Sequence, residues 1–281
     1  MIDTLYIKIT ENCNLHCPFC YVDNKNNLID TDVAIRAIEK YNPDTIVFHG
    51  GEPMLYPEKI LDILDKYPDK NFSITSNLTL PLNAPRISIL KKCSIATSYS
   101  IDRFTDEVTE KHFKENLHVV NMFSDVTLLV TLSKTQMQSS AKELVKNIKR
   151  LHCKYVLFER LYTEDPDTNL SLMTDNYLNE LMLLLPGPEN VLKQMMINAI
   201  NNNSVVFNLN CDKTVVTLNP DGTIQSCPNL ITHKRTRRKE CLTCDIYEYC
   251  REDCISFKKI CMFPRKTFLR IKEDLYGNAN K

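Results

Sequence analysis

Apolar residues in the first 160 positions recur in two alternating patterns, one typical of strands and the other of helices. Short apolar runs predict six strands, at residues 5–10, 45–48, 72–75, 95–101, 126–132 and 155–158. Apolar residues three and four apart predict helices between them, at 30–41, 57–67, 85–92, 106–120 and 140–151. Because strands and helices alternate, we expect a parallel sheet with right-handed crossovers. Six units are fewer than the eight of a closed barrel, so the prediction is an α/β fold, a partial (β/α)6 TIM-like barrel.

The pattern changes near residue 204. Residues 165–204 predict two helices separated by a Pro-Gly-Pro break, and after them the alternation stops. Seven of the 12 cysteines fall between Cys211 and Cys261. The stretch Asn219–Gly222 lies between two short strand-like runs and predicts a hairpin turn. We therefore expect two domains, a barrel at 1–204 and a small Cys-rich domain at 205–281.

Charge and hydropathy exclude several classes of protein. The 281 residues carry 35 Lys and Arg against 35 Asp and Glu, so the chain lacks the basic excess typical of nucleic-acid binding. No apolar run reaches the ~18 residues that a membrane span needs. The first residues lack the basic start and apolar stretch of a signal peptide. The sequence therefore predicts a cytoplasmic protein that binds neither nucleic acid nor membrane.

Glycine and cysteine usage narrow the choice of cofactor. The chain has only five glycines, and their positions match neither a P-loop nor a dinucleotide-binding G-x-G-x-x-G motif. Cytosolic thiols are kept reduced, so the cysteines are more simply ligands of a metal or a cluster than disulfides.

The first group of cysteines, Cys13, Cys17 and Cys20, directly follows the first predicted strand. Cys17 and Cys20 alone would suit a thiol–disulfide redox pair, which leaves Cys13 without a role. A zinc site needs a fourth ligand, and His16 is poorly spaced for it. A third interpretation, alongside these two, is a cubane iron–sulfur cluster held by three thiolates, with the fourth iron open to another ligand.

The spacing C-x3-C-x2-C, with the aromatic Phe19 before the last cysteine, resembles the radical S-adenosylmethionine (SAM) superfamily. The sequence Gly-Gly-Glu-Pro at 50–53, after the second predicted strand, strengthens this resemblance, although such a stretch can also be a plain turn. Glycine lets a backbone approach a ligand closely, and a carboxylate suits an ammonium group. The resemblance implies a SAM-binding 4Fe–4S cluster on the three cysteines. It also implies that Gly50, Gly51, Glu52 and Pro53 hold the SAM amino group.

Polar residues at other strand ends fit the same resemblance. The residues that it assigns to SAM binding are Phe19, Asn77, Ser100, Asp102 and Glu159. In a (β/α) barrel the carboxyl ends of the strands face the active site, although each of these residues can equally be a structural polar group. The chemistry implied is one-electron reduction by a donor such as flavodoxin or ferredoxin, cleavage of SAM, and hydrogen abstraction by a 5′-deoxyadenosyl radical.

The C-terminal cysteines resemble the seven-cysteine SPASM domain, which in its relatives binds two auxiliary 4Fe–4S clusters. The resemblance implies an outer cluster on Cys241, Cys244, Cys250 and Cys261, and an inner cluster on Cys211, Cys227 and Cys254. A zinc ribbon explains only some of these cysteines. The inner cluster then has three thiolates, and we expect its open iron to bind the thiolate of a Cys-containing substrate; Cys93, Cys153, a histidine or a carboxylate of the chain are the alternative fourth ligands. Cys93 and Cys153 are expected to be core residues.

Proteins with this combination of domains mostly modify peptides. The resemblance therefore implies a ribosomal peptide maturase that forms thioether or carbon–carbon cross-links in a peptide or protein substrate. Sulfatase maturation, dehydrogenation of a small alcohol, and a non-catalytic zinc-binding module stay open. The cysteine loop begins at residue 13, which leaves no room for a preceding recognition domain, so a separate peptide-recognition protein is an expected partner.

Overall fold

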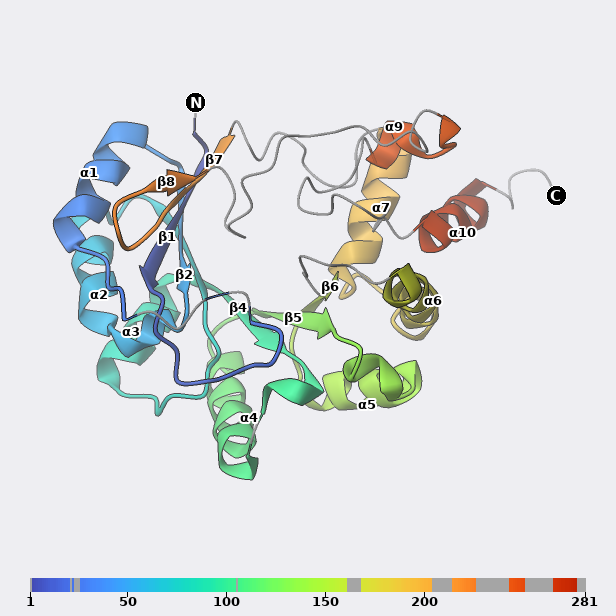
Figure 1. Ribbon diagram of the computed structural model, residues 1–281, viewed down its shortest axis with the longest axis horizontal. Coiled ribbons are helices and arrows are strands. Elements are labelled where there is room, and N and C mark those ends of the chain that lie inside the picture. Colours follow the sequence, from blue (N-terminus) through green and yellow to red (C-terminus); the bar gives the residue numbers. More distant parts are fainter. Residues whose placement is uncertain are drawn as a thin grey trace. The chain divides into compact units, whose positions relative to one another are not determined.

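The computed structural model describes residues 2–20, 22, 26–104, 106–160, 168–203, 214–225, 243–250 and 265–276. Strands and helices alternate from β1 to β6, as the sequence predicts (Figure 1). The strands are β1 (Thr4–Thr10), β2 (Thr45–Gly50), β3 (Asn71–Thr75), β4 (Ser94–Tyr99), β5 (Val126–Leu132), β6 (Tyr155–Arg160), β7 (Val215–Leu218) and β8 (Ile224–Gln225). The longer helices are α1 (Thr31–Tyr41), α2 (Pro57–Lys66), α3 (Ala84–Lys92), α4 (Glu107–Asn121), α5 (Ala141–Arg150), α6 (Thr168–Leu184), α7 (Val191–Asn201) and α10 (Arg265–Tyr276).

The chain divides into two compact units, each described here by itself. The first contains α1–α4, β1–β4, the beginning of β5, and the β7–β8 hairpin. Its strands follow the order β4-β3-β2-β1-β7-β8, and every neighbouring pair is parallel except β7 with β8. The second unit contains the end of β5, β6, α5–α7 and the helices after residue 242. The fold is thus α/β with a mostly parallel sheet.

Side-chain caps fix where several helices begin. Asp30 accepts a hydrogen bond from the backbone N–H of Asp32 at the start of α1. Asn83 caps α3, and Asp106 caps α4, in the same way. Because the first N–H groups of a helix have no partner within the helix, such caps set its first residue. These short polar residues made the helix starts predictable to within about two positions.

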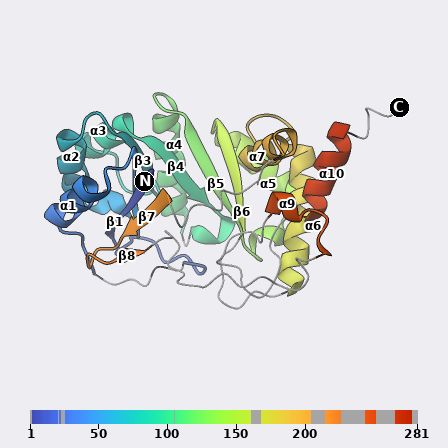
Figure 2. The same ribbon diagram turned by 90° about the horizontal axis from the view of Figure 1, so that it is seen from above.

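One face of the first unit's sheet is apolar and fully covered. Leu5 is aligned with Ile46 and Ile7 with Phe48, and this row continues through β3 and β4 to Ile74 and Ile95. These side chains are at most 2% exposed. Figures 1 and 2 show α1, α2 and α3 packed side by side in this unit, and α1 contacts β1 directly. Burial of this row against the helices stabilises the unit.

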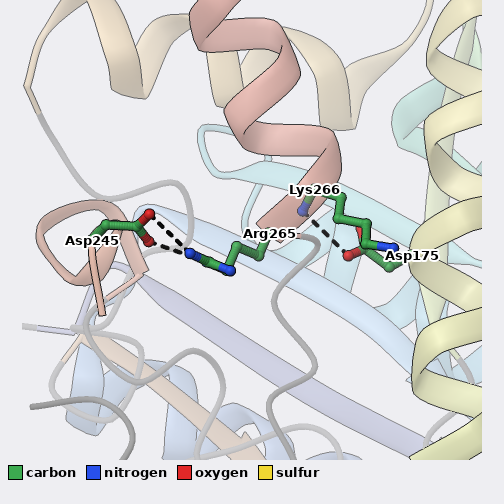
Figure 3. Close-up of polar contacts among 4 residues, drawn as sticks. All are labelled: Asp175, Asp245, Arg265 and Lys266. Atoms are coloured by element: carbon green, nitrogen blue, oxygen red, sulfur yellow. Dashed lines mark hydrogen bonds and ion pairs between the residues drawn. The ribbon is translucent and has the colours of Figure 1, made fainter. Parts of the chain in front are cut away.

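In the second unit, α10 is attached to neighbouring segments by two groups of polar contacts (Figure 3). The guanidinium of Arg265 donates to both carboxylate oxygens of Asp245, at 3.1 and 2.9 Å. Asp175, from α6, accepts from the backbone N–H of Lys266 at 3.2 Å and from the hydroxyl of Thr267 at 3.2 Å. Asp175 therefore supplies the N-terminal cap of α10 from another helix.

Replacement of Asp175 by alanine is expected to lower the free energy of unfolding by about 1 kcal/mol, because it removes this cap. Asp245→Ala is the matched control, since its ion pair with Arg265 is half exposed to solvent and is expected to contribute less than the cap, about 0.5 kcal/mol. Urea unfolding of the two variants measures the difference. Equal effects of the two substitutions would contradict the capping role.

The elements agree with the sequence prediction in number and order up to residue 204, and the hairpin at Asn219–Gly222 is confirmed. Two details differ. The fourth strand ends at Tyr99, and Ile101 begins a short 3-10 turn, η2 (Ile101–Arg103). In addition, β7 pairs in parallel with β1 and extends the first unit's sheet, although it lies beyond the expected boundary. The boundary itself stays a prediction. Among the described residues, no helix has the length and apolarity that crossing a bilayer requires.

Candidate functional site

The polar residues singled out in the sequence gather at the carboxyl ends of the first unit's strands. The cysteine loop follows β1, the Gly50-Gly51-Glu52 segment ends β2, and Ser76 and Asn77 follow β3. The η2 turn, with Arg103, follows β4. Hydrogen bonds join these segments to one another, so the four strand ends form one site. This is the edge at which parallel α/β sheets carry their active sites.

The three cysteines of the first loop are free thiols. Cys13 and Cys17 are half-buried, and Cys20 is exposed. Burial raises the pKa of Cys13, and it raises that of Cys17 to about 11, with further increases from the neighbouring cysteines. The three thiols thus lie close enough to influence one another. Within the described ranges, no three His, Cys, Asp or Glu side chains converge tightly enough for a single metal ion.

Gly50 and Gly51 let β2 pass directly against the start of the cysteine loop. The N–H of Gly51 donates to the carbonyl of Thr10, and the N–H of Glu52 donates to that of Asn12, each at 2.8 Å. A Cβ atom on Gly50 would lie 2.2 Å from the Thr10 carbonyl oxygen, and one on Gly51 would lie 2.1 Å from that of Asn12. Gly50 also has φ = +139°, a conformation that favours glycine. Only glycine fits at these two positions.

Glu52 joins the ends of β2 and β3. Its carboxylate is fully buried and accepts from the N–H of Met54 at 2.9 Å, from the hydroxyl of Ser76 at 2.9 Å and from the N–H of Asn77 at 2.6 Å. Burial raises the pKa of this carboxyl group, while the three hydrogen bonds act in the opposite direction. The structure therefore gives Glu52 a structural role. Its expected contact with the SAM amino group stays a prediction.

Asn77 connects this carboxylate to the cysteine loop. Its side-chain amide donates to Asn14 Oδ1 at 2.8 Å and approaches Cys13 Sγ at 3.7 Å. Its own side-chain oxygen accepts from the N–H and hydroxyl of Thr79. Because every polar group of the Asn77 side chain has a protein partner, the residue is held rigidly beside Cys13.

Arg103 belongs to the site but was not identified from the sequence. Its side chain is 1% exposed and donates from one terminal nitrogen to the carbonyl of Asn77 at 2.8 Å, while the other terminal nitrogen, Nη1, has no partner. The charge of Arg103 lowers the pKa of Cys17, against the larger effect of burial. The buried guanidinium acts electrostatically on Cys13 and Cys17, and it would counteract the negative charge of their thiolates. Its position could have identified it as a site residue, because Arg103 directly follows Asp102 at the end of the fourth predicted strand.

The other residues assigned to SAM binding lie as follows. Ser100 is buried and donates to the carboxylate of Asp102, which is half-buried. Pro53 is buried in a short 3-10 turn, and Phe19 is half-buried in the cysteine loop. Glu159 lies near the end of β6 in the second unit, where it is exposed. Their contacts with SAM remain predictions.

Most of the C-terminal cysteines lie outside the described residues: Cys211, Cys227, Cys241, Cys254 and Cys261. Cys244 is a half-buried free thiol, and Cys250 ends the short helix α9 (Tyr247–Cys250). The two auxiliary clusters and the SPASM domain therefore remain predictions. Cys93 is buried, as expected for a core residue, whereas Cys153 is only half-buried.

The residues at the strand ends fit a cluster with three thiolate ligands. The donors are three thiols on one loop, which is the ligand chemistry of iron–sulfur clusters. A cubane binds each thiolate to a separate iron and therefore spaces the thiolates more widely than one metal ion does. Arg103, whose Nη1 has no partner, adds a buried positive charge that acts on Cys13 and Cys17. These observations define a protein whose mostly parallel α/β sheet carries a three-thiol cofactor site at its strand ends.

Comparison with known families identifies the class. The family model described as "Radical SAM superfamily" matches residues 7–154, more than half of the chain. The chain therefore belongs to the radical SAM superfamily. Membership implies an enzyme with a 4Fe–4S cluster and SAM as cofactors.

Individual relatives resemble parts of the chain. Uncharacterized protein MJ0907 of Methanocaldococcus jannaschii is 38% identical over 109 residues, 35% of this chain and 38% of that protein. A probable GTP 3′,8-cyclase of Methanocella arvoryzae is 34% identical over 118 residues, 37% of each chain. The crystal structure of Streptococcus suis SuiB has a TM-score of 0.63 at 14% identity, over 93% of this chain and 77% of that one. The chain thus spans under two fifths of these curated relatives, and the likeness to SuiB concerns the fold.

Proposed function

We propose that this protein is a radical SAM peptide maturase. In this proposal Cys13, Cys17 and Cys20 hold the SAM-binding cluster. Bound together, the cluster and SAM supply a 5′-deoxyadenosyl radical that removes a hydrogen atom from a peptide substrate. The product is a ribosomally made peptide with a thioether or carbon–carbon cross-link.

One observation carries the radical SAM part of the proposal: the cysteine loop, the glycine pair and the Glu52 hydrogen bonds meet at one edge of the sheet. In this arrangement the chain's own residues have distinct tasks. Gly50 and Gly51 bring the β2 backbone against the loop, Glu52 fixes the neighbouring strand end, and Arg103 adds positive charge beside the thiols. A fixed site of this kind orients a reactive cofactor and excludes water.

The peptide part of the proposal rests on the seven cysteines at 211–261 and their resemblance to the SPASM pattern. A flavodoxin or ferredoxin as electron donor, a separate peptide-recognition protein and a Cys-containing substrate belong to the same proposal. A second candidate is cyclisation of a guanine nucleotide, because three relatives at 28–34% identity are named GTP 3′,8-cyclase, two of them with the word probable.

The radical SAM assignment is tested by a triple variant, Cys13→Ala, Cys17→Ala and Cys20→Ala. We expect it to lose all SAM cleavage, measured as 5′-deoxyadenosine. With three clusters at four irons each, it should also lose about a third of roughly 12 irons per chain. Cys153→Ala is the matched control, because that cysteine lies outside the three proposed sets of thiolate ligands, and the variant should keep both properties. Formation of 5′-deoxyadenosine by the triple variant would contradict the assignment.

The substrate class is tested by mass spectrometry after anaerobic incubation with SAM and a reductant. A cross-linked peptide has lost two hydrogen atoms, so a short Cys-containing peptide encoded beside the gene should lose their mass. The peptide assignment fails if such peptides stay unchanged while GTP is consumed, and the second candidate would then be favoured.

A further inference from the structure

Buried polar atoms without partners are concentrated at one place in the first unit. Within the described part of the chain, eight buried side-chain nitrogen or oxygen atoms have no hydrogen-bond partner. Four of them lie on the neighbouring strands β2, β1 and β7 or directly after β7: Lys8 Nζ, His49 Nε2, Thr217 Oγ1 and Asn219 Oδ1. Native proteins satisfy nearly all buried polar groups, so a group of four requires an explanation.

The strand register brings these side chains together. Lys8 of β1 is aligned with His49 of β2, and Tyr6 of β1 is aligned with Thr217 of β7. Asn219 comes directly after Leu218, the last aligned residue of β7. Aligned residues of parallel strands project from the same face, and every second residue shares that face. The set therefore lies opposite the apolar row of Leu5 and Ile7, and the ring of Tyr6 meets the ring of His49 edge-on at 5.3 Å.

The set carries one positive charge without an ion pair. Lys8 is fully buried, which lowers the pKa of its ammonium group, and the two carboxylates whose charges act against this, Glu11 and Asp221, are hydrogen-bonded elsewhere. Glu11 accepts from Asn27 at 2.7 Å, and Asp221 accepts from the N–H and hydroxyl of Thr223. His49 is neutral, because burial and the charge of Lys8 lower its pKa to about 3. A buried ammonium without a counter-ion is costly, and such a residue is explained most simply by a ligand that supplies the missing charge.

We propose that Lys8, His49 and Thr217 form a binding site for a single carboxylate group of the substrate, while Asn219 Oδ1, which can only accept, is left to face the Lys8 ammonium. One ammonium balances one carboxylate charge, and the His49 ring and the Thr217 hydroxyl can donate to its oxygens. A phosphate carries more charge than this set balances. The site lies at the reacting end of the sheet, since His49 immediately precedes Gly50, and Lys8 is five residues before Cys13. The prediction that a carboxylate binds here does not depend on the proposed function. The assignment of that carboxylate to the substrate does rest on it.

The test is thermal unfolding of the anaerobically purified holoenzyme, with sodium acetate as the probe. Sodium chloride at matched ionic strength is the reference. At about ten times its dissociation constant, acetate should raise the midpoint of the wild type by roughly 3 °C. Lys8→Met should lose this shift. Without acetate, the variant should unfold at a higher temperature than the wild type, because the unpaired buried charge is gone.

Two threonines provide a matched pair of variants that change no charge. Thr217 and Thr97 are both fully buried with unpartnered hydroxyls, but Thr97 lies in β4 on the opposite, apolar face. Thr217→Val should weaken the acetate shift, and Thr97→Val should leave it unchanged. Equal effects of the two substitutions would overturn the proposal, as would a wild type that acetate stabilises no more than chloride.

Two further outcomes separate this site from the proposed function. Sodium phosphate that stabilises the wild type more than acetate does would overturn the carboxylate assignment in favour of a phosphoryl group. Acetate binding in a wild type that forms no 5′-deoxyadenosine would contradict the proposed function and support the site. The carboxylate site is therefore tested by the acetate shift, and the proposed function is tested by formation of 5′-deoxyadenosine.

Discussion

Replacement of Gly51 by alanine is expected to remove the iron of the first cluster, about four atoms per chain. The new Cβ would lie 2.1 Å from the carbonyl oxygen of Asn12, which directly precedes Cys13. That oxygen belongs to the backbone, so the overlap is relieved only by moving the cysteine loop or the end of β2. Iron analysis after anaerobic reconstitution, together with 5′-deoxyadenosine formation, measures the loss.

Gly187→Ala is the matched control for this substitution. A Cβ there would also lie 2.1 Å from another atom, but that atom is the carboxylate oxygen of Glu189, at the end of a flexible side chain. Rotation of Glu189 relieves the contact, so iron content and SAM cleavage should stay at wild-type values. If Gly51→Ala also retained full iron, the close backbone approach would have no part in building the site.

Replacement of Glu52 by alanine is expected to destabilise the fold by roughly 3–5 kcal/mol. The substitution leaves two backbone N–H groups and the Ser76 hydroxyl buried without their acceptor. Each unsatisfied group costs about 1–3 kcal/mol, partly relieved by relaxation of the site. Urea unfolding under anaerobic conditions gives the change in free energy.

Glu52→Gln separates the structural role of this residue from its predicted contact with SAM. Glutamine keeps one acceptor oxygen, so its loss of stability should be clearly smaller than that of alanine. If Glu52 also accepts from the SAM ammonium, the glutamine variant should bind SAM more weakly without losing iron. An alanine variant within about 0.5 kcal/mol of the wild type would contradict the structural role.

The sequence was sufficient to predict the elements of the barrel because periodicity and caps are local signals. Asp30 and Asp106 mark helix starts whatever the rest of the chain does, and Val126–Leu132 is recognisable as a strand on its own. The site was partly predictable for a related reason. Each strand end carries its polar residues next to an apolar run, and parallel strands bring those ends to one edge.

Features that depend on register were not predictable. No local signal aligns Lys8 with His49, because their proximity follows from the pairing of β1 with β2. The three donors to Glu52 come from two segments, and their assignment requires the relative positions of β2 and β3. The hairpin turn was sufficient to predict the four-residue strand β7. Nothing in the sequence of β7, however, indicates that β1 is its partner.

The pairing of β7 with β1 also constrains when the sheet can be completed. Residues 4–7 are made first, yet their partners on one side, residues 215–218, are made only after the entire series of barrel strands. During synthesis on the ribosome, that edge of β1 therefore remains without its native neighbour. An unpaired strand edge is a site for association with other chains, and such distant pairing slows folding. Nascent chains that stop before residue 215 should consequently aggregate more readily than full-length chains, and chaperones that shield strand edges should improve the yield of folded protein.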